Sequence, residues 1–159
     1  MTVIVNSSPF LALERIGCLQ LLPDLFQQVV RPQSVWDELT AGSRAYGISE
    51  ELSKSKWVKT LPDPPTASFR PELGKGETAA IALAIQEKAG LILLDDLAAR
   101  NVAEELGLQI SGTLGVLIAG YQKKLIPDIE QPIHDLRECG FHMSDSLVRY
   151  VKKQSMENK

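Results

Sequence analysis

The sequence lacks three features that would point directly to a function: a long apolar run, a cluster of soft metal ligands and an excess of positive charge. No hydrophobic stretch approaches the roughly 20 residues that a membrane-spanning helix needs. The two cysteines, Cys18 and Cys139, and the two histidines, His134 and His142, share no zinc-ligand spacing. Lys and Arg total 17 against 20 Asp and Glu, a net charge of −3. This argues against binding duplex DNA through bulk positive charge, but leaves open an enzyme that approaches phosphates through bound metal.

The N-terminal segment and the cysteines indicate a cytoplasmic protein without a membrane partner. Residues 1–5 lack the basic region and the long apolar region of a signal peptide. Cys18 and Cys139 lie far apart in the sequence, so we expect two reduced, mostly buried thiols in the cytoplasm.

The length and the hydrophobic content favour a single domain that spans residues 1–159. A chain of 159 residues with 44% hydrophobic residues builds one core comfortably and two only with difficulty. Four of the nine prolines fall within residues 62–71, and with Gly74 and Gly76 they predict an internal loop over residues 62–76. Residues 154–159 are expected to form a flexible tail.

Hydrophobic patterns predict short strands that alternate with helices. Such alternation is typical of a parallel sheet covered on both faces, so the predicted fold is three-layer α/β/α. Ser8 is expected to cap a helix that starts at Pro9, and Pro32 to open another. The strands are predicted at residues 3–5, 28–30, 57–61, 91–94 and 108–110, and the helices at 9–16, 19–26, 32–39, 78–88, 98–106, 113–124, 128–139 and 144–153.

Two polar groups follow predicted strands, where ligands bind in parallel sheets. The first strand ends at Asn6, and the apolar strand 91–94 ends at Asp95 and Asp96. Two adjacent carboxylates repel each other, and a bound divalent cation would offset that repulsion. Alternatively, one Asp faces the site while the other caps the following helix. Both readings hold together if Asp95 faces the pocket and Asp96 caps.

Two glutamates on other predicted helices extend this oxygen-rich set. Glu77 lies in a first helical turn, where a surface carboxylate is also favourable, and Glu38 taken alone is better explained as an exposed polar residue. Asn6, Glu38, Glu77 and Asp95 together supply only oxygen ligands, which suit Mg²⁺ or Mn²⁺. Spacing alone does not establish that the four converge.

Five segments of the chain, in order, resemble the motifs of PIN domains. They are residues 4–13, where PIN domains end their first strand in an Asp followed by small hydroxyl residues, then residues 32–39, 76–84, 93–100 with 112–117, and 140–144. The segments around Glu77 and Asp95 are similar to those of a toxin-like (VapC-like) subgroup of uncharacterised prokaryotic proteins. The resemblance covers nearly the whole chain.

This resemblance implies a metal-dependent endoribonuclease, often the toxin of a toxin–antitoxin pair and often a homodimer. Carried over by position, Glu38, Glu77 and Asp95 would be catalytic metal ligands for Mg²⁺ or Mn²⁺, and Asp96 a further carboxylate. Ser8, Thr113 and Arg100 would position the water or the RNA. An alternative for Arg100 is an ion pair with Asp96 or Glu104, and for Thr113 a helix N-cap.

Residue 6 departs from the PIN pattern. The chain has Asn6 where active PIN nucleases usually have Asp. The amide oxygen still coordinates a hard cation, but one negative charge is lost from the site. The alternative function is therefore a catalytically weakened PIN-like module that binds RNA or protein. A further alternative, a phosphoacceptor site at Asp95 and Asp96, fits less well because the first strand carries no Asp.

Overall fold

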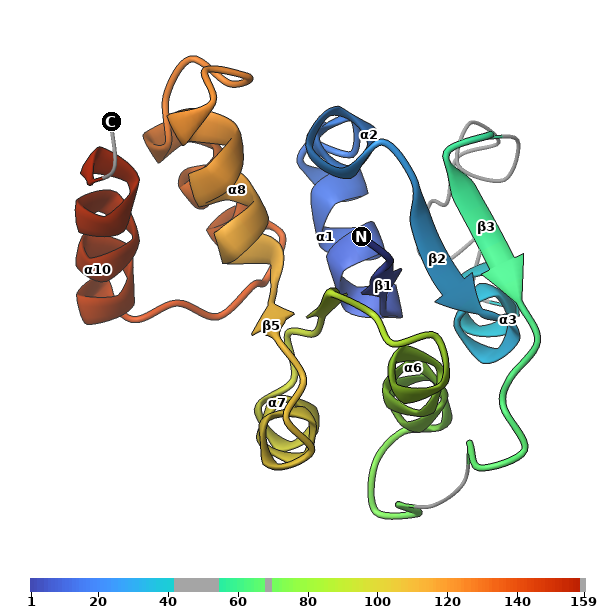
Figure 1. The fold of residues 1–159 in the computed structure, drawn as a ribbon. Coiled ribbons are helices and arrows are strands. Elements are labelled where there is room, and N and C mark those ends of the chain that lie inside the picture. The colour runs from blue at the N-terminus through green and yellow to red at the C-terminus, as the bar shows by residue number, and fades with distance from the viewer. Residues whose placement is uncertain (42–54, 68–69, 158–159) are drawn as a thin grey trace.

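The computed structural model describes residues 1–41, 55–67 and 70–157, and in them one parallel sheet is sandwiched between two helical layers (Figure 1). The strands are β1 (Val3–Val5), β2 (Val29–Pro32), β3 (Val58–Leu61), β4 (Leu91–Leu93) and β5 (Ile110–Ser111). The helices are α1 (Ser7–Arg15), α2 (Leu21–Phe26), α3 (Gln33–Ala41), α6 (Lys75–Gln86), α7 (Leu97–Glu105), α8 (Thr113–Gln122), α9 (Glu130–Glu138) and α10 (Asp145–Met156). The predicted three-layer α/β/α fold is confirmed.

All strand pairings are parallel, and the spatial order is β3-β2-β1-β4-β5. The chain builds outward from β1 through β2 to β3, and then crosses to the other side of β1 to form β4 and β5. The strand order therefore reverses between β1 and β4. These two strands pair in parallel, with Val5 of β1 opposite Leu93 of β4. In open parallel sheets such a reversal opens a crevice at the carboxyl ends of the two strands, which is the preferred ligand position.

Alternate side chains of the inner strands enter two separate hydrophobic clusters. Val3, Val5 and Leu93 face a cluster that includes side chains of α1, α2, α3, α8, α9 and α10. Ile4 and Ile92 face a smaller cluster built with α6 and α7. Figure 1 shows α6 and α7 together on one side of the strands and α1, α2 and α8 on the other. Burial on both faces explains why these strands are apolar throughout instead of alternating with polar residues.

Several predicted boundaries and caps are corrected. Helix α1 begins at Ser7, so Asn6 occupies the N-cap position and Ser8 lies inside the first turn. Pro32 ends β2 instead of opening α3, and α6 begins at Lys75, within the predicted loop 62–76. Helix α10 continues to Met156 with Ser155 buried, so residues 154–156 are helical and do not belong to the predicted tail. A 3.6-residue pattern does not fix helix ends to within a turn.

The cysteine prediction is correct in part. Cys18 and Cys139 are both free thiols. Burial, helped by the negative charge of Asp135, raises the pKa of Cys18. Cys139, however, is exposed, because it directly follows α9 on the surface. Within the described ranges, no helix is long and apolar enough to cross a membrane.

Candidate functional site

The carboxyl ends of β1 and β4 bring Asn6 and Asp95 to the crevice where the strand order reverses. Asn6 continues the pairing of β1, because its backbone N–H donates to the carbonyl oxygen of Leu93 at 3.2 Å. Its side chain is buried, at 4% exposure, and Oδ1 accepts no hydrogen bond from any residue that the structure describes. Leaving a buried acceptor unsatisfied costs about 1–3 kcal/mol. An unsatisfied amide oxygen at this edge of the sheet fits a cation ligand.

Glu38 of α3 is held against the same crevice by two donors from distant parts of the chain. Ser7 Oγ donates to Oε2 at 2.6 Å, and the backbone N–H of Gly76 donates to Oε1 at 2.8 Å. A Cβ atom at position 76 would lie only 2.2 Å from Oε1, so this approach requires glycine. The two bonds join the start of α1, the middle of α3 and the first turn of α6 at one carboxylate.

Glu77 and Asp96 lie at the starts of two neighbouring helices, where backbone donors are free. Glu77 Oε1 accepts from the N–H of Gly74 at 3.1 Å, and Asp96 Oδ2 accepts from the N–H of Ala99 at 3.0 Å. The predicted capping role of Asp96 is thus confirmed, since it is the N-cap of α7.

Glu77 is electrostatically coupled to two other carboxylates of the site. Burial raises its pKa most, followed by the negative charge of Asp96, while the Gly74 N–H opposes the shift. A hydrogen bond with the Asp96 side chain and the charge of Glu38 raise the pKa further. Glu38, Glu77 and Asp96 therefore belong to one group of mutually repelling charges, which a nearby cation would stabilise.

Asp95 is held on the far side of β4 by Thr113, the first residue of α8. The Thr113 N–H donates to Oδ1 at 2.8 Å and its hydroxyl donates to Oδ2 at 2.7 Å. Burial raises the pKa of Asp95, although these two bonds and the charge of Arg100 act in the opposite direction. Thr113 is therefore not the predicted N-cap, a position that Gly112 takes, because its hydroxyl is engaged by Asp95.

Arg100 of α7 points toward the strand end instead of along its own helix. Its Nη1 donates to the carbonyl oxygen of Leu94 at 2.8 Å. Of the described ion pairs none joins Arg100 to Asp96 or Glu104, so that alternative is wrong. The guanidinium instead lies close enough to Asp95 to lower its pKa.

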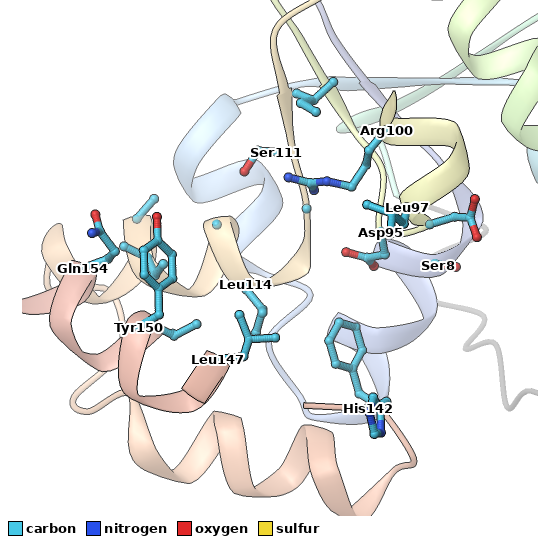
Figure 2. A pocket seen from close by; sticks show the side chains of 18 of the residues that line it. Ser8, Asp95, Leu97, Arg100, Ser111, Leu114, His142, Leu147, Tyr150 and Gln154 are labelled. Carbon is cyan, nitrogen blue, oxygen red and sulfur yellow. The ribbon is translucent and has the colours of Figure 1, made fainter. Parts of the chain in front are cut away.

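A cavity of about 900 Å³ opens beside Asp95 and Asp96. Ser8 and Arg100 also line it, and α8 and α10 form its opposite wall (Figure 2). Glu38 and Glu77 do not line this cavity. The predicted site residues thus fall into two adjoining groups, with Asp96 common to both.

The side-chain oxygens suit a hard divalent cation, although in this structure they do not form a complete coordination site. Amide and carboxylate oxygens are the ligands that Mg²⁺ and Mn²⁺ prefer. Over residues 1–41, 55–67 and 70–157, no three acidic, His or Cys side chains stand close enough to share one ion. Each of the four carboxylates is instead engaged by a backbone N–H donor. The unsatisfied Asn6 oxygen and the coupled carboxylates of Glu38, Glu77 and Asp96 fit a hard metal ion by the chemistry of their donor atoms.

Ser7 is the site residue that sequence reasoning missed. The sequence points to Ser8 as a helix cap, yet it is Ser7 that is buried and bonded to Glu38. The one available signal was its position directly after the strand end. The sequence identifies Gly76 only as a loop residue, because the approach of Glu38 to its backbone depends on tertiary structure.

These features define a class: a three-layer α/β domain with carboxylates gathered at the crevice of a parallel sheet. The chain belongs to the PIN-domain family, since the model of the DUF3368 family, described as a PIN domain, matches residues 2–157. PIN domains are generally nucleases that typically use divalent metals, so the chain has a nuclease-type fold and the family implies a nucleic-acid substrate. No curated protein and no solved structure matches the chain.

The coupled carboxylates predict that removing the charge of Glu77 stabilises the metal-free protein. The folded state raises the pKa of Glu77, so protonation contributes stability below the ordinary Glu pKa, and this contribution is lost as the pH rises through the folded pKa. Glu77→Gln keeps an acceptor for Gly74. In EDTA it should be more stable than the parent at about pH 8, with the difference vanishing near about pH 4.

Urea unfolding of both proteins across that range measures the effect. Glu104→Gln, an exposed charge removal on α7, is the matched control and should show no such trend. A parent chain as stable as Glu77→Gln at the alkaline end would contradict the coupling.

Proposed function

We propose that the chain is a metal-dependent endoribonuclease that hydrolyses RNA phosphodiesters with Mg²⁺ or Mn²⁺. The observation that carries the proposal is the buried, unsatisfied Oδ1 of Asn6 beside repelling carboxylates on a PIN fold. Asn6, Glu38, Glu77, Asp95 and Asp96 would hold the metal. When bound, the ion supplies Lewis acidity and lowers the pKa of a water molecule for attack on phosphorus.

The remaining residues of the crevice position and orient the reacting groups. Thr113 fixes both oxygens of Asp95, and Ser7 with Gly76 fixes Glu38, so these carboxylates are held before substrate arrives. Arg100, beside Asp95 and lining the cavity, offers its remaining guanidinium donors to a phosphate oxygen. Ser8, exposed at the start of α1, lines the same cavity and is placed to contact substrate.

The biological role that we propose rests on the resemblance to toxin-like PIN proteins. The chain would act as the toxin of a toxin–antitoxin pair, in the cytoplasm, as a homodimer built from a single domain of residues 1–159. A small antitoxin would silence it by presenting Arg or Lys to the acidic crevice, since charge-assisted bonds to carboxylates are the strong ones.

Asn6 favours a second candidate, a weakened PIN-like module that binds RNA or protein without efficient cleavage. An amide carries one negative charge less than a carboxylate, so both the affinity for the metal and the acidity of its water should fall. Titration calorimetry with Mn²⁺ separates the two candidates, because tight metal binding coupled with cleavage would exclude the binding-only module.

Purified protein with Mn²⁺ should cleave RNA, and Glu77→Ala or Asp95→Ala should reduce cleavage to the level without protein. Each change removes a carboxylate that would hold the metal. Gel analysis of labelled RNA fragments measures the activity, and Glu104→Ala, on the exposed face of α7, is the control that retains it. If the alanine variants at positions 77 and 95 cleave like the parent, the activity comes from a contaminant.

Asn6→Asp should raise cleavage at limiting Mn²⁺ by at least about tenfold, corresponding to about 1.4 kcal/mol of transition-state stabilisation. The new carboxylate replaces an acceptor that has no hydrogen-bond donor to lose. Asn101→Asp makes the same chemical change at an exposed position of α7 and should leave the rate unchanged. Equal rates for the parent and Asn6→Asp would show that Asn6 does not limit the activity.

A further inference from the structure

Arg31 of β2 is a buried cation to which the proposed reaction gives no role. Its side chain lies in the protein interior, at 4% exposure, and burial lowers its pKa to about 10. Nε donates to the hydroxyl of Thr60 on β3 at 2.9 Å, and Nη1 meets no acceptor among the residues that the structure describes. None of the described ion pairs gives Arg31 a carboxylate. A buried guanidinium without a carboxylate destabilises a fold, so its presence needs another explanation.

The guanidinium group instead faces the aromatic rings of two helices. Its Cζ atom lies 3.9 Å from the centre of the Trp36 ring of α3 and 5.7 Å from the centre of the Phe10 ring of α1. Both distances fall within the about 6 Å over which a cation is attracted to the face of an aromatic ring. Both rings belong to the hydrophobic cluster on this face of the sheet. Arg31 therefore joins α1 to α3, and its bond to Thr60 anchors it to the edge strand β3.

The same two helices carry the side chains that meet at the Glu38 carboxylate. Ser7 lies one turn before Phe10 in α1, and its hydroxyl donates to Glu38 Oε2 at 2.6 Å. Glu38 lies two residues after Trp36 in α3. Because Glu38 is itself exposed, its position depends on the helix that carries it and on these polar contacts. The bond from Ser7 thus requires that α1 and α3 keep a fixed separation.

We propose that Arg31 is a positioning residue, which holds α1 and α3 together through Phe10 and Trp36 and so fixes Glu38 at the acidic crevice. This role rests on the proposed function, because it takes Glu38 as a ligand of the metal. An apolar side chain at position 31 would fill the same space without orienting the two rings, since only a cation is attracted to both of their faces. The chain accordingly keeps a charge that costs stability at the place where it orders a carboxylate of the site.

Hydrogen exchange of the Gly76 amide tests this role in metal-free protein. Gly76 lies in the first turn of α6, where no helical acceptor is available, and its N–H donates to Glu38 Oε1 at 2.8 Å. Protection of this amide therefore reports whether Glu38 is in place. In EDTA, Arg31→Met should accelerate exchange at Gly76 by at least about tenfold, as expected for the loss of one hydrogen bond to a charged group. Nuclear magnetic resonance measures the rate for this single amide.

Two comparisons make the loss specific to Glu38. The Thr113 amide also lies in a first helical turn and donates to the Asp95 carboxylate at 2.8 Å, and its protection should be the same in Arg31→Met as in the parent. Glu38→Ala should remove the protection of Gly76 directly. Adding Arg31→Met to Glu38→Ala should cause no further loss, because both changes act through one bond.

The unfolding temperature separates this role from ordinary core packing. Arg31→Met removes a buried charge and should unfold at the temperature of the parent or above it, so that the loss at Gly76 is local. Arg149→Met makes the same chemical change at an exposed position of α10 and should leave Gly76 unaffected. If Arg31→Met does not fold, Trp36→Leu, at a partly exposed position, removes one of the two rings and should produce the same loss at Gly76.

Mn²⁺ binding then connects the position of Glu38 to the metal. Titration calorimetry should show that Arg31→Met binds Mn²⁺ about tenfold more weakly than the parent, as is typical when a residue that orients a ligand is lost.

Unchanged protection of Gly76 in Arg31→Met, an equal loss at Gly76 and Thr113, or a further loss when Arg31→Met is added to Glu38→Ala would overturn this role. Its failure is distinguishable from that of the proposed function. A parent that binds no Mn²⁺ would contradict the nuclease, while the exchange rates still decide what Arg31 does. A parent that binds Mn²⁺, with Gly76 still protected in Arg31→Met, would support the nuclease and exclude the role of Arg31.

Discussion

Repulsion among carboxylates at one edge of the sheet is the constraint around which the structure is organised. Glu38, Glu77 and Asp96 lie in or at the start of three different helices, and burial together with the charges of Asp96 and Glu38 raises the pKa of Glu77. The fold holds them in place with hydrogen bonds from main-chain and side-chain donors, among them Ser7 and Gly76. Because a fold without function would gain stability by dispersing these charges, their proximity supports the proposed cation site.

The position of Asn6 gives this site its particular character. It lies at the end of the central strand, where the strand order reverses, and its side chain is buried without a donor for Oδ1. An Asp at the same place would bring another negative charge to the edge of the sheet that carries Asp95 and Asp96, and the amide avoids that charge. In the proposed metal site, Asn6 would keep an oxygen ligand while lowering the repulsion, at the expense of metal affinity. The net charge of −3 is consistent with the proposed nuclease, in which acidic residues would hold the metal.

The sequence was sufficient to predict the layers of the fold and the positions of Asn6, Asp95 and Asp96, since these depend on local patterns. An apolar run followed by Asp95 and Asp96 marks a buried strand and its end, wherever the strand lies in the sheet. Glu38 was different, because an exposed glutamate on a helix carries no local signal of its bond to Gly76. For the same reason the sequence suggests a helix cap at Thr113, since its partner Asp95 lies 18 residues away. Contacts between distant residues, which decide the geometry of the site, follow from the strand order and not from spacing.

The most direct test of the account is a crystal structure of the chain with bound Mn²⁺, located by anomalous scattering. We expect a peak within coordination distance of Asn6 Oδ1, with carboxylate oxygens of Glu77 and Asp96 turned toward it. The hydrogen bond from Gly74 to Glu77 should lengthen or break in that structure, since the same oxygen is engaged there in the metal-free protein. A peak elsewhere, or no peak beside Asn6 at saturating Mn²⁺, would contradict the assignment of this crevice as the metal site.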